Sequence, residues 1–101
     1  MSRWIKKSSG SLTGSGILTR KHSHYFGFTM VIDSVYEVVK NFKAYNALSA
    51  IDGREVEEWP IKPGDYQAGH SHADPVLCVD GIYYSVPSGA RAIIYYWDEI
   101  S

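Results

Sequence analysis

Glycine divides this chain of 101 residues into pieces that are mostly the length of β-strands. The nine glycines are spread along the whole sequence, and few intervals between them could hold a helix of ordinary length. Hydrophobic residues make up 45% of the chain and charged residues 21%, so it has enough apolar surface to fold. A chain of this length has room for a single core, and we expect one all-β domain.

Alternation of residue type locates the main strands. In residues 24–33, one face is predicted to carry the apolar set Phe26, Phe28, Met30 and Ile32. The dipeptide Asp80-Gly81 favours a tight type I′ hairpin between strands at 76–79 and 82–86. Residues 90–97 are apolar or aromatic on both faces, which is typical of a strand that is covered on both sides.

The segment 34–50 fits two patterns. At helical spacing, a stripe forms from Val35, Val38, Val39, Phe42 and Tyr45, and residues 34–37 fit a capping box. Its β-branched content and glycine-rich surroundings favour a strand. Residues 55–61 also have the pattern of a strand, which brings the total to about eight. We therefore predict an antiparallel two-sheet sandwich, jelly-roll-like, over residues 10–101, after a basic N-terminal arm over residues 1–9.

Positive charge is concentrated in the first third of the chain. Residues 1–32 hold five lysines and arginines and no acid, whereas residues 33–101 hold five cations and eleven acids. Five cations dispersed among serine and glycine are too sparse for a dedicated nucleic-acid patch, so we do not expect a nucleic-acid partner. The sequence shows neither a secretory signal nor an apolar run of about 20 residues, and we expect a soluble protein that is made in a cytoplasm and has no membrane partner.

A repeated triplet, His22-Ser23-His24 and His70-Ser71-His72, is the strongest hint of metal chemistry. Two histidines at i and i+2 on a strand point the same way and could ligate zinc, nickel or iron. Gly64, His70 and His72 resemble the opening of the cupin metal motif. That motif continues with a glutamate, where this chain offers only Asp74, and its later histidine is replaced by Ala92. A metal at His70 and His72 is therefore an alternative to solvated surface histidines, and no cofactor is expected.

Candidate nucleophiles and paired acids lack the setting that catalysis needs. No serine lies in a Gly-x-Ser-x-Gly elbow, and Cys78 lies in an apolar run that predicts burial. Glu57 and Glu58 are adjacent, so on a strand they face opposite sides, and we interpret them as a charged edge that resists aggregation. We expect no enzymatic activity and no small-molecule substrate.

Aromatic residues indicate an interface. Eight tyrosines and three tryptophans are typical of protein contacts as well as of β-sheets. A small sandwich cannot bury both faces of residues 90–97, so one set of side chains should enter the core and the other should meet a partner. The predicted interface combines that strand with the basic arm: Trp4, Ile5, Lys6, Lys7, Ile93, Tyr95 and Trp97.

Residues 10–97 resemble the short β-sandwich proteins found among the structural genes of tailed bacteriophages. The matching stretches are Gly14–Thr19, Tyr25–Thr29, Tyr45–Gly53, Val79–Tyr84 and Ala92–Tyr96. The resemblance implies a virion protein without enzymatic activity, synthesised in the host cytoplasm. Its expected role is a capsid decoration or cement protein that binds the major capsid protein or another virion protein as a homo-oligomer, with a trimer favoured. A receptor-binding, fibre, tail or neck module is the first alternative, and a small cupin-like metalloprotein is the second.

Overall fold

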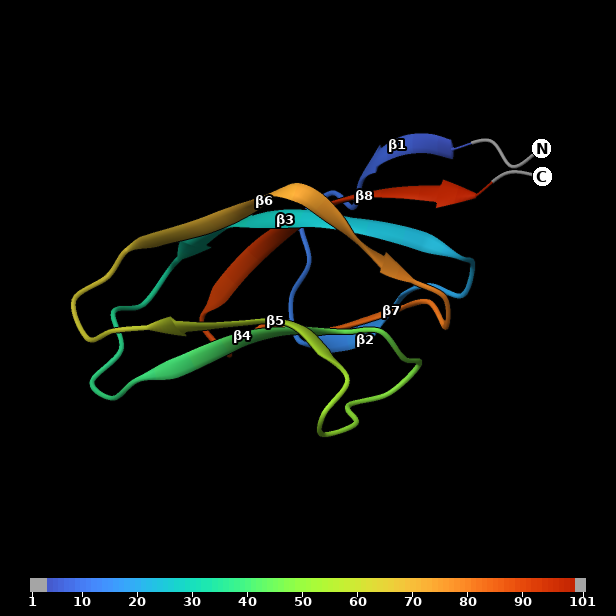
Figure 1. Ribbon diagram of the computed structural model, residues 1–101. Coiled ribbons are helices and arrows are strands. Elements are labelled where there is room, and N and C mark those ends of the chain that lie inside the picture. The colour runs from blue at the N-terminus through green and yellow to red at the C-terminus, as the bar shows by residue number, and fades with distance from the viewer. Residues whose placement is uncertain (1–3, 100–101) are drawn as a thin grey trace.

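The computed structural model describes residues 4–99, and within that range it contains eight strands and no helix, so no helix there could span a membrane. The strands are β1 (Trp4–Ser8), β2 (Ser15–Thr19), β3 (Ser23–Ile32), β4 (Lys40–Tyr45), β5 (Glu55–Ile61), β6 (Gln67–Cys78), β7 (Ile82–Ser85) and β8 (Ala90–Glu99). Sheet A has the order β1-β8-β3-β6, and sheet B has the order β2-β7-β4-β5. The two sheets pack face to face (Figure 1). The predicted antiparallel two-sheet sandwich is confirmed.

The pairing of strands follows one rule. Each strand of the first half pairs antiparallel with a strand of the second half: β1 with β8, β2 with β7, β3 with β6 and β4 with β5. These four pairs form one long double-stranded antiparallel ribbon. When the ribbon rolls up, β3 also pairs with β8, and β4 also pairs with β7. The result is a jelly roll, a fold shared by viral capsid, lectin and cupin domains. The topology therefore does not by itself identify a function.

The core lies between the sheets and is rich in aromatic and branched side chains. Phe28 of sheet A stacks on Phe42 of sheet B, with ring centroids 4.0 Å apart. Strand β8 alternates as the sequence predicts, because its inward residues are buried and its outward residues are at least partly exposed. The inward set is Ala90, Ala92, Ile94, Tyr96 and Asp98, and the outward set includes Ile93, Tyr95 and Trp97.

The predicted face is wrong at Phe26 because β3 contains a β-bulge. Its register against β8 shifts between Tyr25 and Gly27, so Tyr25 joins Phe28 in the core and Phe26 turns to the outer face. Gly27 has a φ of 153°, and a Cβ at this position would collide with the carbonyl oxygen of His70. Only glycine therefore fits the bulge without displacing β6.

The predicted hairpin at Asp80-Gly81 is also wrong. Strand β6 belongs to sheet A and β7 belongs to sheet B, so this turn carries the chain from one sheet to the other. Gly81 has a φ of 97°, but none of the residues other than glycine in the described range has a positive φ. A type I′ turn needs positive φ at both central positions, and Asp80 does not supply it.

The ambiguous segment 34–50 is a strand only in its centre. Strand β4 covers Lys40–Tyr45, and loops occupy residues 33–39 and 46–54. Phe42 and Ala44 face the core, whereas Val38 lies in the first loop and is exposed. All three valines that favoured an extended strand, Val35, Val38 and Val39, thus lie in the first loop.

Candidate functional site

The outer face of sheet A carries an aromatic cluster, which we define as Trp4, His24, Phe26, Tyr95 and Trp97. Trp4 lies edge-on to His24 with ring centroids 4.3 Å apart, and Phe26 lies edge-on to Trp97 at 4.7 Å. The Nζ atom of Lys6 is 5.6 Å from the centre of a Trp97 ring, within the range of a cation–π contact. Tyr95 remains 39% exposed. Three strands thus contribute to one partly exposed aromatic surface.

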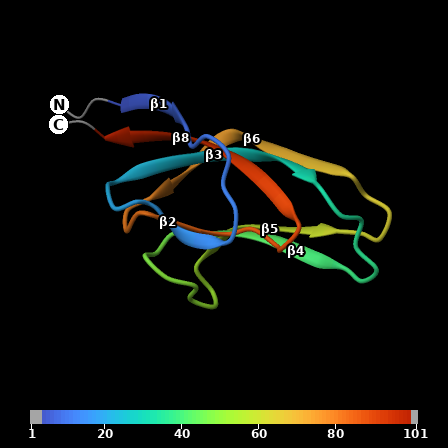
Figure 2. The same ribbon diagram turned by 180° about the vertical axis from the view of Figure 1, so that it is seen from behind.

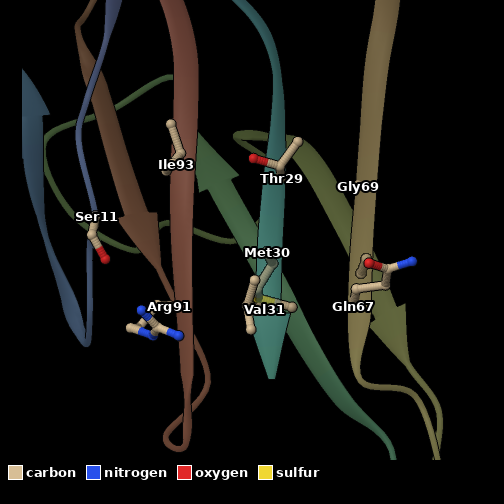
Figure 3. A pocket seen from close by; sticks show the side chains of 9 residues that line it. Ser11, Thr29, Met30, Val31, Gln67, Gly69, Arg91 and Ile93 are labelled. Carbon is tan, nitrogen blue, oxygen red and sulfur yellow. The ribbon is translucent and has the colours of Figure 1, made fainter. Parts of the chain in front are cut away.

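A shallow trough continues along this face from the aromatic cluster. Its end near Trp97 is a hollow of about 290 Å³, and its other end is a hollow of about 550 Å³. A third hollow shares lining residues with both of them, so the trough is continuous. Figure 3 shows the wider end, where side chains from β8, β3 and β6 project around it: Arg91, Ile93, Thr29, Val31 and Gln67. Along the β6 side, the trough is lined by the small residues Gly69 and Ser71.

The residues predicted to form an interface do not all share one surface. Trp4, Lys6, Tyr95 and Trp97 gather around the aromatic cluster, and Ile93 lines the wider hollow. Residues 4–8, part of the predicted basic arm, form the edge strand β1, whereas Arg3 lies outside the described residues. Alternation along β1 turns Ile5 and Lys7 away from Trp97, and Lys7 Nζ lies 3.2 Å from Asp98 Oδ2. Ile5 is exposed.

A second candidate site, the edge cluster, consists of Glu57, His70 and His72. It lies where the edge strand β5 of sheet B faces the edge strand β6 of sheet A (Figure 1). His70 Nδ1 is 3.2 Å from both carboxylate oxygens of Glu57, and His72 Nε2 is 3.3 Å from Oε1. The three ligand-type atoms all lie within 4.8 Å of one another. The structure therefore adds a carboxylate to the histidine pair singled out in the sequence.

Aromatic rings hold both histidines of the edge cluster. Trp59 stacks on His70 with ring centroids 4.9 Å apart, and Tyr25 lies edge-on to His72 at 5.7 Å. The Tyr25 hydroxyl donates a hydrogen bond of 3.1 Å to Glu57 Oε1. Burial, and then the adjacent carboxylate, raise the pKa of Tyr25 far above its usual range, so this hydroxyl stays a donor.

The carboxylate of Glu57 has no permanent cation beside it. Within residues 4–99 its ion-pair contacts are the two imidazoles, and no lysine or arginine reaches it, although Glu57 is buried. His72 Nε2 is close enough to Glu57 for an ion pair, but the direction is not that of a hydrogen bond. This buried nitrogen therefore has no hydrogen-bond partner among residues 4–99. Hydrogen bonds among the described residues therefore leave one buried polar atom of the edge cluster unsatisfied.

Glu57 and Tyr25 are members of the site that the sequence interpretation missed. Glu57 and Glu58 do face opposite sides of β5, and Glu58 pairs with Lys43 at 3.6 Å on the outer side. Glu57 itself is buried rather than part of a charged edge. The sequence did contain a sign of this burial. Alternation along residues 55–61 places Glu57 on the same face as Trp59 and Ile61.

The first His-Ser-His triplet forms no comparable site. His22 precedes β3 and lies 3.2 Å from Glu99, whereas His24 belongs to the aromatic cluster. The residue that faces inward is Ser23, whose hydroxyl donates a 2.9 Å hydrogen bond to the buried Asp98. Asp98 Oδ1 also accepts a hydrogen bond from Thr19, and Oδ2 pairs with Lys7, so both carboxylate oxygens are engaged.

Cys78 is buried, as the sequence predicts. Burial raises the pKa of its thiol to about 11, so the thiol is protonated at neutral pH. A nucleophilic cysteine acts as the thiolate, so the surroundings of Cys78 suit packing rather than catalysis.

Comparison of this chain with protein-family models, with curated proteins and with solved structures finds no match. Arguments about its function therefore start from the two surfaces described above.

Proposed function

We propose that this chain is a non-enzymatic structural protein that attaches to a larger assembly through the outer face of sheet A. The observation that carries the proposal is the aromatic cluster beside the trough. Tyr95 is 39% exposed and Trp97 is partly exposed, so a partner that covers them gains about 25 cal/mol for each Å² of apolar surface that it removes from water. Tryptophan and tyrosine are also the residues most enriched at the energetic centres of interfaces.

The assembly that we propose is the virion of a tailed bacteriophage, with this chain as a capsid decoration or cement protein. The support is the sequence resemblance over residues 10–97, together with a fold that viral capsid proteins also use. Lys6 at the rim of the aromatic cluster suits an acidic patch on the major capsid protein. We propose a homo-oligomer, with a trimer favoured, as the unit that binds the particle.

A substitution in the aromatic cluster tests this proposal. Trp97→Asp places a charge at the centre of the surface, and we expect it to abolish both self-association and binding to capsids while the β-sheet spectrum is retained. Tyr66→Asp is the matched control, because Tyr66 is an exposed aromatic residue outside the cluster. Light scattering gives the mass in solution, and co-sedimentation with capsids of the major capsid protein from the same genome gives binding.

The outcomes of this experiment separate the alternatives. A wild-type trimer that co-sediments with capsids, and loses both properties only in Trp97→Asp, supports the decoration role. Binding to purified tails or fibres but not to capsids supports the first alternative, a tail, fibre or receptor-binding module. A monomer that binds none of these particles contradicts the proposal.

A further inference from the structure

We propose that Glu57, His70 and His72 bind one divalent transition-metal ion, with zinc the ion that this ligand set suits best. Two imidazoles and one carboxylate are a ligand set that zinc uses in proteins when the remaining position is open to water. Because Glu57 belongs to sheet B and the histidines belong to sheet A, the bound ion would join the two sheets at their open edge. This inference is independent of the proposed virion role.

Two of the three ligand–ligand distances in the edge cluster are close to those around a single ion, and the third pair, His70 Nδ1 and His72 Nε2, lies within 4.8 Å. Two ligand atoms bound to tetrahedral zinc, each about 2.0–2.2 Å from the metal, lie about 3.3–3.5 Å apart. The contacts from Glu57 to His70 Nδ1 and to His72 Nε2 are 3.2 and 3.3 Å. Small rotations of the side chains therefore suffice to place these atoms around one ion.

Charge favours a cation at this position. A buried carboxylate without a lysine or arginine partner is costly, and the neighbouring imidazoles carry charge only when protonated. A divalent ion satisfies the carboxylate and also uses the lone pair of His72 Nε2, the buried nitrogen that has no hydrogen-bond partner in the described part of the chain. One ion thus completes two groups that protein contacts leave incomplete.

The surroundings hold the ligands in place while leaving the ion a path to the site. Trp59 and Tyr25 fix the planes of the two imidazoles, and the Tyr25 hydroxyl orients Glu57 from the core side. On the other side, the side chains of His70 and His72 are 36% and 23% exposed. The site therefore lies close to solvent, and rotation of the partly exposed imidazoles would admit an ion to the buried ligand atoms and leave its remaining positions to water.

The experiment uses untagged full-length protein that has been treated with a chelator. It is titrated with Zn²⁺ by calorimetry and with Co²⁺ by visible absorption. We expect one ion per chain, a cobalt d–d band that Zn²⁺ displaces, and an increase in Tm with Zn²⁺. Glu57→Gln and His72→Gln should each weaken zinc binding by more than about 100-fold and abolish the increase in Tm. Tyr25→Phe, which removes an orienting contact, should weaken it by about 10-fold.

The first triplet supplies the matched control. His22→Gln together with His24→Gln removes two imidazoles from an identical tripeptide, and this variant should keep wild-type zinc affinity. If the edge variants do not fold, NMR of the wild type decides, since Zn²⁺ must shift the ring signals of His70 and His72 and leave those of the first triplet unchanged. Absence of stoichiometric zinc binding, or binding that the control loses and the edge variants keep, overturns the proposal.

Discussion

The two His-Ser-His triplets have the same sequence and opposite orientations. In the first, Ser23 faces inward to the buried Asp98 and His24 faces outward into the aromatic cluster. In the second, His70 and His72 face the buried Glu57, and Ser71 faces outward. A change of phase by one residue thus decides whether the same tripeptide presents a hydroxyl or two imidazoles to a buried carboxylate.

The two buried carboxylates that these triplets face are satisfied in different ways. Asp98 has two hydroxyl donors and a lysine, which together neutralise and solvate it. Glu57 has one hydroxyl donor and two imidazoles, whose roles as donor, acceptor or metal ligand can change. Burial alone therefore does not distinguish a structural carboxylate from a candidate ligand, whereas the chemistry of its partners does.

The bulge at Gly27 produces the phase of the first triplet, and its loss should have the largest effect. Gly27→Ala should lower the free energy of unfolding by about 4 kcal/mol, because its Cβ collides with the backbone of His70 and the φ is strained. Gly10→Ala is the control, since Gly10 also has positive φ but open space around it, and about 1 kcal/mol is expected. Urea denaturation measures both. Similar values for the two variants would mean that the close approach to β6 is not what requires glycine.

Asp98→Asn should have the next largest effect. The amide keeps the shape but removes the charge that Lys7, Thr19 and Ser23 engage, and we expect a loss of about 2 kcal/mol in urea denaturation. Asp33→Asn is the matched control, because the Asp33–Arg91 pair is exposed and should contribute less than about 1 kcal/mol. Equal losses in the two variants would show that burial of Asp98 adds nothing.

Glu57→Gln in metal-free protein should have the smallest effect, less than about 1 kcal/mol in the same measurement. The amide can still accept from Tyr25, and each imidazole can act as donor or acceptor. A loss as large as that of Asp98→Asn would assign Glu57 a fixed structural role.

The rate of Cys78 alkylation at about pH 8 is an independent control for these two variants. At this pH the thiol of the folded protein remains protonated, because its pKa is about 11. Cys78 lies opposite Ser23 in the pairing of β3 with β6, and Ser23 donates to Asp98. Asp98→Asn should therefore raise the alkylation rate, and Glu57→Gln should not.

The sequence by itself determined the features that depend on residues close together along the chain. Alternation in residues 90–97 separated two sets of side chains, with Ile94 and Tyr96 in one phase and Tyr95 and Trp97 in the other, and the structure buries the first set. The spacing of His70 and His72 likewise placed both imidazoles on one face of β6. Glycine spacing and the number of short segments were enough to predict a two-sheet sandwich, because they exclude long helices whatever the strand order.

The tertiary structure decided everything that depends on which strands become neighbours. At the bulge, β6 passes so close to Gly27 that no Cβ fits, and the bulge reversed the phase predicted for Phe26. The turn at Asp80-Gly81 crosses between sheets because β7 pairs with β2 and β4 instead of β6. Glu57 meets His70 and His72 because β5 and β6 edge different sheets on the same side of the sandwich. Local periodicity fixes the direction of a side chain, but only the packing of distant segments fixes what it faces.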